Sequence, residues 1–281
     1  MVWRCRSFCF DLDQPVVMGI LNVTHDSFSD GGEFFNTAAA LDQAYRMLAE
    51  GAQIIDVGGE STRPGAEEVE QAEELKRVLP IVEHLAADGV AVSVDTRHVA
   101  VAEAAIAQGA AIINDVSGFR DPALRKLVAA SDLGCVVMHM LGEPKSMQLD
   151  PVYDNVVSEV REYLLTQADL LVQAGVYRER ICIDPGPGFG KTFQHNLALL
   201  RATAELASLG YPLMAAYSRK GFIGKLTGTA NPAERVIGSV IVATWAAAQG
   251  ARVIRVHDVK STVEALVAWQ TLVSGGKTID A

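Results

Sequence analysis

The 281 residues are 49% hydrophobic, which is enough for a large core, and a formal net charge of −10 argues against a general surface for nucleic acid or acidic membranes. No stretch reaches the roughly 18 apolar residues of a transmembrane helix. The N-terminus carries Arg4 and Arg6 and lacks the long apolar region of a signal peptide. The four cysteines are scattered, which fits a reducing compartment. We therefore expect a soluble, cytoplasmic protein that binds any anionic ligand through a local cluster of cations.

After a loosely alternating segment at 2–13, one pattern recurs eight times along the chain. An apolar run ends on a polar residue, and a loop and an amphipathic helix follow. Strands covered by helices on both faces read as near-continuous apolar runs, so the pattern predicts a parallel sheet. We expect a (β/α)8 TIM barrel with a short N-terminal β-hairpin that plugs its lower end, as a single domain over residues 1–281. The strands are expected at 16–22, 53–57, 90–95, 110–114, 134–138, 180–184, 213–218 and 252–257.

Helices are expected between most of these strands. Thr37 is a plausible N-cap for the first helix, and Pro80 predicts a kink or break in the second. The last two helices are apolar over much of their circumference, which indicates burial against a partner subunit or within the core of one chain. The expected helices cover 38–50, 67–87, 98–108, 153–174, 232–249 and 259–272.

Polar residues close each predicted strand, and in a barrel of parallel strands they converge on one mouth, where the active site lies. Each also has a plainer interpretation. Asp95 and Asp184 could cap helices, Asn114 could belong to a turn, and we expect His139 to make a structural hydrogen bond. The strand-end residues are Asn22, Asp56, Asp95, Asn114, His139, Asp184, Ser218 with Lys220, and Arg255 with His257.

Cations gather after the last two strands. Arg255 lies inside an apolar strand, where an arginine is costly without an anionic partner or a wet cavity. Residues two apart on a strand point the same way, so Arg255 and His257 can act together. With Arg219 and Lys220 they place positive charge where barrels commonly bind phosphate.

Acceptors for a flat ring are expected opposite these cations. Asp95, Asn114 and Asp184 offer two carboxylates and an amide from three different strands. A carboxylate can accept two parallel N–H bonds, so this set suits the edge of a nitrogen-rich heterocycle. The loop at 186–192 lacks the first glycine of a P-loop, and we interpret it as a shaped loop that packs Phe189 near the mouth. A ligand with a heterocyclic end and a phosphorylated end follows.

The strand-end motifs, taken in order, resemble the dihydropteroate synthase family of the folate pathway. The likeness covers almost the whole chain. It rests on the segments 19–24, 26–32, 56–65, 93–96, 113–118, 138–140, 184–186, 218–220 and 255–258.

The resemblance implies condensation of 6-hydroxymethyl-7,8-dihydropterin diphosphate with 4-aminobenzoate, giving 7,8-dihydropteroate and diphosphate. Mg²⁺ is the implied cofactor, the partners are these small molecules and a second copy of the chain, and sulfonamides would compete with aminobenzoate. Diphosphate would leave first, and the amine would attack the resulting pterin cation.

The resemblance also implies roles for individual residues, of which Asp95, Lys220, Arg255 and His257 would be catalytic. By matching position, Asp95, Asn114, Asp184 and Lys220 would hold the pterin, while Arg255, His257 and Asn22 would hold the diphosphate, Asn22 through Mg²⁺. The aminobenzoate pocket would be framed by Phe28, Thr62, Arg63, Pro64, Phe189, Ser218 and Arg219, and Met138 is a further candidate substrate contact.

Three rival functions stay open. A methyltetrahydrofolate-type methyltransferase would bind the heterocycle but would not need the diphosphate cluster. A non-catalytic pterin-binding paralogue would keep the same pocket without turnover. A phosphosugar isomerase barrel would leave the heterocycle acceptors Asp95, Asn114 and Asp184 unexplained.

Overall fold

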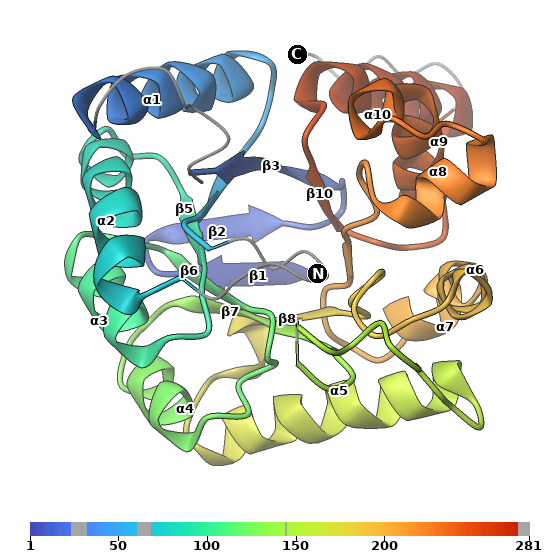
Figure 1. Cartoon of the computed structure of the whole chain (residues 1–281), viewed down its shortest axis with the longest axis horizontal. Helices are drawn as coiled ribbons and strands as arrows, with labels where there is room; N and C mark the ends of the chain where they lie inside the picture. Colours follow the sequence, from blue (N-terminus) through green and yellow to red (C-terminus); the bar gives the residue numbers. More distant parts are fainter. Residues whose placement is uncertain (24–32, 61–68, 144, 275–281) are drawn as a thin grey trace.

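The strands form a barrel surrounded by helices (Figure 1). The computed structural model describes residues 1–23, 33–60, 69–143 and 145–274, with the side chains of 33–36 left out of the description. Seven parallel pairings join the strands in the order β8-β7-β6-β5-β4-β3-β10-β9, and a parallel bridge from Ile183 to Leu213 closes the ring. The strands are β3 Val16–Asn22, β4 Ile54–Gly58, β5 Val92–Asp95, β6 Ile112–Asp115, β7 Gly134–Met138, β8 Ile181–Asp184, β9 Met214–Ala215 and β10 Val253–Val256.

All eight predicted strands are confirmed, and the largest difference is in the seventh. Only Met214–Ala215 pairs there, although the apolar run continues to Ser218. The chain turns away at once, because Lys220 N donates to Tyr217 O at 3.2 Å and Arg219 adopts a left-handed φ of 56°. This turn brings Ser218, Arg219 and Lys220 to the rim of the barrel.

The helices cover the outside of the barrel, and in the described part of the chain none is long and apolar enough to cross a membrane. Their apolar faces pack on the strands, as in α2, whose Val78, Ile81, Val82 and Leu85 are fully buried. The helices are α1 Glu33–Ala49, α2 Gln71–Ala87, α3 Val99–Ala107, α4 Pro122–Ala129, α5 Val156–Gln173, α6 Phe193–Arg201, α7 Thr203–Ala207, α8 Gly221–Thr227, α9 Val236–Ala248 and α10 Val259–Val273, with short 3-10 helices η1 Arg178–Arg180 and η2 Pro232–Glu234.

Two helix predictions need correction, and four α-helices were not predicted. Helix α1 already begins at Glu33, so Thr37 lies inside it and is not its N-cap. Helix α2 runs through Pro80 without a break, because its buried inner face outweighs the one backbone hydrogen bond that proline removes. Helices α4, α6, α7 and α8 were not predicted, although Asp121 caps α4 through Ala123 N at 2.8 Å and Pro122 occupies its first turn.

The N-terminal hairpin closes the lower end of the barrel, as predicted. Its strands, β1 Val2–Cys5 and β2 Phe8–Asp11, pair antiparallel and lie behind the barrel in Figure 1. Trp3 is fully buried and its Nε1 donates to Arg180 O at 3.1 Å. It packs in one cluster with side chains that fill the barrel interior, including Met18 and Ile54. The open mouth is therefore at the opposite, C-terminal end of the strands.

Candidate active site

The strand register places several polar residues at the same level of the mouth. Asn22 pairs with Gly58, Gly58 with Asp95, and Asp95 with Asn114 on successive strands β3, β4, β5 and β6. Residues opposite one another in a parallel sheet point to the same face. Three predicted site residues from three strands are thereby brought together.

Arg255 lies at the centre of this group and bridges two carboxylates. From β10, its Nε donates to Asp56 Oδ2 at 2.6 Å and its NH2 group donates to Asp95 Oδ2 at 2.8 Å. Asn114 Nδ2 donates to Asp56 Oδ2 at 3.2 Å. The expectation that Arg255 needs an anionic partner is confirmed, but within the chain those partners are aspartates at the proposed pterin end. Sequence analysis placed Asp56 at a strand end and assigned it no role, yet it is fully buried and holds this network together.

Asp95 keeps one oxygen for a ligand. Its Oδ2 accepts from Arg255, whereas its Oδ1 is buried and accepts no hydrogen bond from the described residues. Burial raises the pKa of Asp95 to about 7, although the Arg255 guanidinium opposes this shift. Asp95 is therefore poised between its neutral and charged forms near neutral pH, and it does not cap a helix.

Asp184, Lys220 and Phe189 line the neighbouring part of the mouth. Asp184 Oδ1 accepts from Gly186 N at 2.7 Å, and Lys220 Nζ donates to Pro187 O at 2.7 Å while lying 4.7 Å from the centroid of the Phe189 ring. Burial lowers the pKa of Lys220 to about 8, and burial raises the pKa of Asp184. The two groups attract each other electrostatically, so they form an acceptor and donor pair beside an aromatic face.

The glycine after Asp184 is required by close packing. Gly186 has a φ of 63°, and an added Cβ would lie 2.0 Å from the carbonyl oxygen of His139. His139 itself has the structural role expected for it, since it is buried and its Nδ1 contacts Lys191 Nζ at 2.8 Å. Burial and the nearby Lys191 lower the pKa of His139 to about 2. Nothing in the sequence pattern indicated that Lys191 is buried in this loop.

The rim residues are held by one another. Ser218 Oγ accepts from His257 N at 3.1 Å and lies 3.1 Å from His257 Nδ1. Arg219 donates from Nε to Asp258 Oδ2 at 2.9 Å, and a second, shorter contact joins its NH2 group to Asp258 Oδ1. The 218–220 turn thus sends its two cations in different directions, Lys220 toward Asp184 and Pro187 and Arg219 toward Asp258.

The remaining predicted residues take no part in these polar contacts. Met138 is buried in a small apolar cluster with Val116, Met140, Met147 and Phe189. Phe28, Thr62, Arg63 and Pro64 fall at positions outside the described residues, so no contact is assigned to them.

Asn22 suits a hard divalent cation. Its half-buried side chain accepts no hydrogen bond from the described residues, and an added Cβ at Gly58 would lie 3.7 Å from both Asn22 Oδ1 and Asp95 Cβ. Asn22 and Asp95 therefore flank Gly58 on either side at the mouth, within van der Waals reach of this position. An amide oxygen that completes its shell with water and phosphate oxygens is a typical Mg²⁺ ligand, so the residues present fit this ion.

Comparison with known proteins agrees with this geometry. The family described as pterin binding enzyme matches residues 18–257. A dihydropteroate synthase from Neisseria meningitidis serogroup B is 48% identical over 277 residues, which cover 96% of this chain and 97% of that protein. The dihydropteroate synthase of Xanthomonas albilineans, solved with 4-aminobenzoic acid, has a TM-score of 0.92 and 45% identity and covers 97% of this chain and 98% of its own. That of Burkholderia cenocepacia, complexed with 7,8-dihydropteroate, has a TM-score of 0.89 and 44% identity over 98% of this chain and 97% of its own.

A barrel with ring acceptors and cations at one mouth is the architecture of a pterin-binding enzyme, and the chain belongs to that family. The three relatives compared are dihydropteroate synthases matched along nearly their full lengths.

Proposed function

We infer that this chain is an enzyme that condenses 6-hydroxymethyl-7,8-dihydropterin diphosphate with 4-aminobenzoate, forming 7,8-dihydropteroate and diphosphate in folate biosynthesis. The observation that carries this conclusion is the convergence of Arg255, Asp95, Asp184 and Lys220 at one mouth of a barrel whose relatives are dihydropteroate synthases. A methyltransferase is disfavoured because the cations of strand ends seven and eight would then have no diphosphate to bind.

We propose that the pterin ring lies between Asp95, Asn114, Asp184 and Lys220. Asp95 Oδ1 is the buried acceptor that faces the ring, and Asn114 keeps its amide oxygen while its nitrogen donates to Asp56. Asp184 accepts ring N–H groups and Lys220 donates to a ring acceptor. When diphosphate leaves, positive charge spreads over the ring, and the Asp95 carboxylate stabilises that charge. The neutral arylamine then attacks the methylene carbon that diphosphate has left, and one N–H proton passes to solvent as the C–N bond forms, so no nucleophilic serine or cysteine is needed.

The leaving group is proposed to lie above Arg255, beside His257 and Asn22. Arg255 holds its guanidinium between Asp56 and Asp95, so it presents a fixed positive charge to this space at no cost of reorganisation. Bound at Asn22, Mg²⁺ would neutralise charge that builds on the diphosphate. Ser218 Oγ accepts from the backbone N of His257 and contacts its Nδ1, and the second contact holds the imidazole so that Nε2 is left for the leaving group.

Aminobenzoate is proposed to bind at the rim, between Phe189, Ser218 and Arg219. Arg219 shares its guanidinium with Asp258 and is about one third exposed, which leaves donors for a carboxylate. Phe28, Thr62, Arg63, Pro64 and Met138 remain candidates for the rest of this pocket. Sulfonamides, as aminobenzoate mimics, are expected to compete for it.

A turnover assay tests the proposed function. The purified chain should form dihydropteroate from the two substrates with Mg²⁺, and should lose activity when a chelator removes the metal and regain it when Mg²⁺ is restored. Asn22→Ala should raise the Mg²⁺ concentration needed for half-maximal rate. A folded chain that gives no product under these conditions would instead support a non-catalytic paralogue.

We also expect kcat/KM to depend on pH through two residues of the pterin pocket. Asp95 acts as a carboxylate and Lys220 as an ammonium, and their pKa values are about 7 and about 8. The rate should therefore rise as pH increases through about 7 and fall above about 8, giving a bell-shaped profile. An arginine stays charged to a much higher pH than Lys220, so in Lys220→Arg the alkaline limb of the kcat/KM profile should move to higher pH. An alkaline limb that does not move would assign it to another group.

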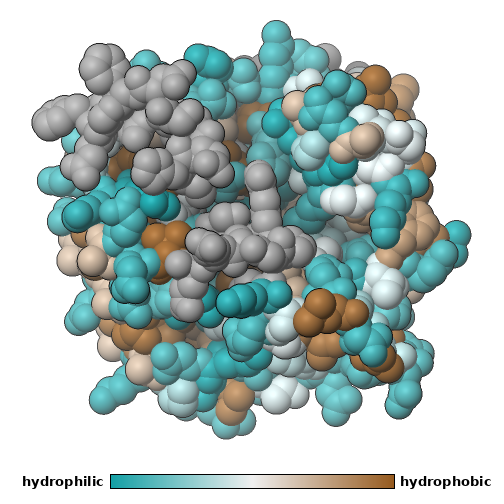
Figure 2. Space-filling view, viewed as in Figure 1, coloured by the Kyte–Doolittle hydropathy of each residue, from teal (hydrophilic) through white to brown (hydrophobic). Residues whose placement is uncertain are grey.

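The chain is further proposed to form a homodimer through α9 and α10. These helices pack against each other and expose Ile237, Ile241, Val267 and Leu272, with 76%, 62%, 49% and 82% of each residue accessible. Hydrophobic colour follows this edge of the molecule in Figure 2. An exposed apolar surface of this kind marks an interface.

The four cysteines are all unpaired, which supports the proposal of a cytoplasmic location.

Sedimentation tests the dimer. The unmodified chain should sediment at twice the mass of one chain, and the double variant Ile237→Asp with Ile241→Asp should sediment as a monomer because burial of two carboxylates is costly. Leu149→Asp is the matched control, since Leu149 is 85% exposed away from this surface. A wild-type monomer would exclude the interface.

A further inference from the structure

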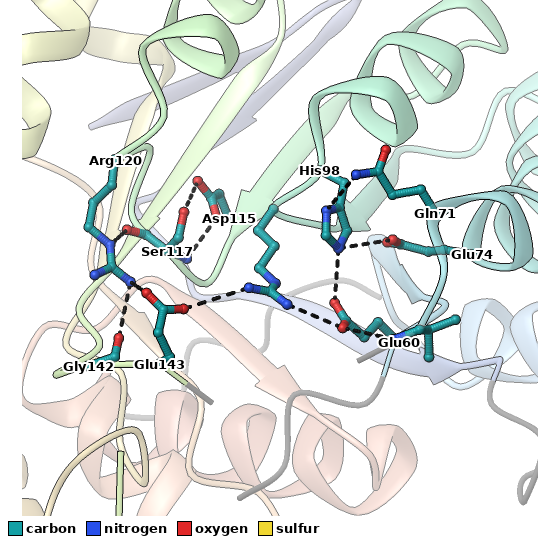
Figure 3. A network of polar contacts seen from close by, with 11 residues as sticks. Glu60, Gln71, Glu74, His98, Asp115, Ser117, Arg120, Gly142 and Glu143 are labelled. Carbon is teal, nitrogen blue, oxygen red and sulfur yellow. Dashed lines mark hydrogen bonds and ion pairs between the residues drawn. The ribbon is translucent and has the colours of Figure 1, made fainter. Parts of the chain in front are cut away.

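Three possible metal ligands converge beside the mouth. Glu60 follows β4, Glu74 lies on α2, and His98 precedes α3, and in Figure 3 their polar atoms face one another. His98 Nε2 lies 3.5 Å from Glu60 Oε2 and 3.8 Å from Glu74 Oε2, and one ligand atom from each residue fits within 4.8 Å of the other two. Ligand atoms of a tetrahedral zinc ion lie about 3.3 Å apart, so the two His98 separations are close to this value and the two carboxylates would have to move toward each other to surround one ion.

Glu74 is the least explained member of this cluster. It is fully buried, and neither of its carboxylate oxygens makes a well-formed hydrogen bond to the described part of the chain. His98 Nε2 is buried and likewise makes no hydrogen bond there. Burial raises the pKa of Glu74, although the Thr96 hydroxyl and the nearby His98 and Arg97 oppose this shift. Buried polar atoms normally have partners, and a carboxylate without one is costly unless a cation lies beside it.

The two carboxylate oxygens of Glu60 have different neighbours. Its Oε1 accepts from Val69 N at 3.3 Å and lies 3.5 Å from the NH2 group of Arg97, which leaves Oε2 facing His98. Arg97 pairs directly with Glu60 and acts on Glu74 only from a greater distance, so His98 is the one group of the described residues within ion-pair distance of the Glu74 carboxylate.

The far side of the imidazole is also held in place. Gln71 Nε2 lies 3.4 Å from His98 Nδ1. Because the two ends of an amide can be exchanged, the Gln71 oxygen can accept from Nδ1–H, which directs the lone pair of Nε2 at the cluster. A second hydrogen bond of this kind is typical of a histidine that binds a metal.

We propose that Glu60, Glu74 and His98 bind a divalent transition-metal ion, such as Zn²⁺, at a site separate from the Mg²⁺ position at Asn22. One imidazole and two carboxylates with a fourth position for water form a common zinc coordination set, and imidazole favours such metals over Mg²⁺. Glu60 follows β4, so the ion would join the end of this strand to α2 and to the start of α3.

The rival explanation is an ion pair in which a protonated His98 satisfies both carboxylates without a metal. The full chain, stripped with a chelator, is titrated with Co²⁺ followed by visible absorption, and with Zn²⁺ followed by elemental analysis after dialysis. We expect one tightly bound equivalent per chain, with an absorption typical of four-coordinate Co²⁺.

Variants separate the two explanations. His98→Lys keeps a cation between the carboxylates but removes the imidazole ligand, and Glu74→Gln removes a carboxylate. Each should weaken Zn²⁺ binding by at least about tenfold. His84→Lys is the matched control, because His84 is exposed on α2 and contacts Pro80 O, and it should bind as the unmodified chain does. Asn22→Ala should likewise leave this titration unchanged.

Two outcomes would overturn the proposal. One is the absence of a stoichiometric equivalent in the unmodified chain, and the other is equal Zn²⁺ binding by the unmodified chain and a His98→Lys variant that unfolds at the same temperature. Either would assign the cluster to an ion pair only. Because binding is measured without substrates, a failed turnover assay would not affect this result, nor would a failed titration affect the proposed reaction.

Discussion

Replacing Arg255 with alanine is expected to lower both stability and activity. The change leaves the buried carboxylates of Asp56 and Asp95 without their cation, and breaking such a pair typically costs about 3–5 kcal/mol in the free energy of unfolding. Urea denaturation measures this loss. Binding of the pterin diphosphate should weaken by about 10²-fold more than binding of the free hydroxymethyl pterin, because the proposed diphosphate contact is charge-assisted.

Two companion variants identify the cause. Arg255→Lys keeps the charge but cannot bridge two carboxylates, so it should recover part of the diphosphate affinity and little of the stability. Asp56→Asn combined with Arg255→Ala should be more stable than Arg255→Ala alone, since one unpaired charge is removed. Equal weakening of both ligands would mean that Arg255 only positions Asp95 and does not meet the diphosphate.

Asp184→Asn is expected to abolish most pterin binding while leaving the fold intact. Asparagine can keep the bond from Gly186 N, but it offers one acceptor where the ring requires a carboxylate, and it no longer attracts Lys220. Loss of a charge-assisted pair of hydrogen bonds corresponds to about 3 kcal/mol, or about 10²-fold in the dissociation constant of the pterin diphosphate, measured by calorimetry.

The free energy of unfolding of Asp184→Asn should rise or stay unchanged, although its pterin affinity falls. Burial raises the pKa of Asp184, which means that the site disfavours its charge, and a neutral amide is tolerated there. Asp42→Asn, an exposed change on α1, is the control for loss of one negative charge. Unchanged pterin affinity in Asp184→Asn would place the ring elsewhere in the barrel.

The sequence was sufficient to predict the barrel, because apolar runs that end on polar residues repeat along the chain. Each of the eight strands follows from this periodicity, and so does the meeting of Asn22, Asp95 and Asn114, since parallel register alone aligns them. The early end of β9 at Ala215 could not be predicted, because the turn at Arg219 depends on a backbone conformation that no residue type there demands.

Contacts between distant residues were harder to predict. Arg255 and Asp56 are 199 positions apart, and nothing local indicates that this arginine reaches across to β4. Glu74 lies in a helix rich in charges, which from sequence alone looks like a solvated face, whereas the structure buries it completely. Lys191 is similar, because burial of a lysine is apparent only once the loop after β8 is folded.

Arg255 both stabilises the folded barrel and faces the proposed ligand, and this has a consequence for resistance to inhibitors. Compounds that occupy the pterin half of the mouth meet side chains on which folding itself depends, so escape by substitution there would carry a penalty in folded protein. Rim positions such as Arg219, whose ion pair is partly exposed, are under no such constraint. Inhibitors aimed at the floor of the mouth should therefore leave fewer tolerated substitutions than inhibitors aimed at its edge.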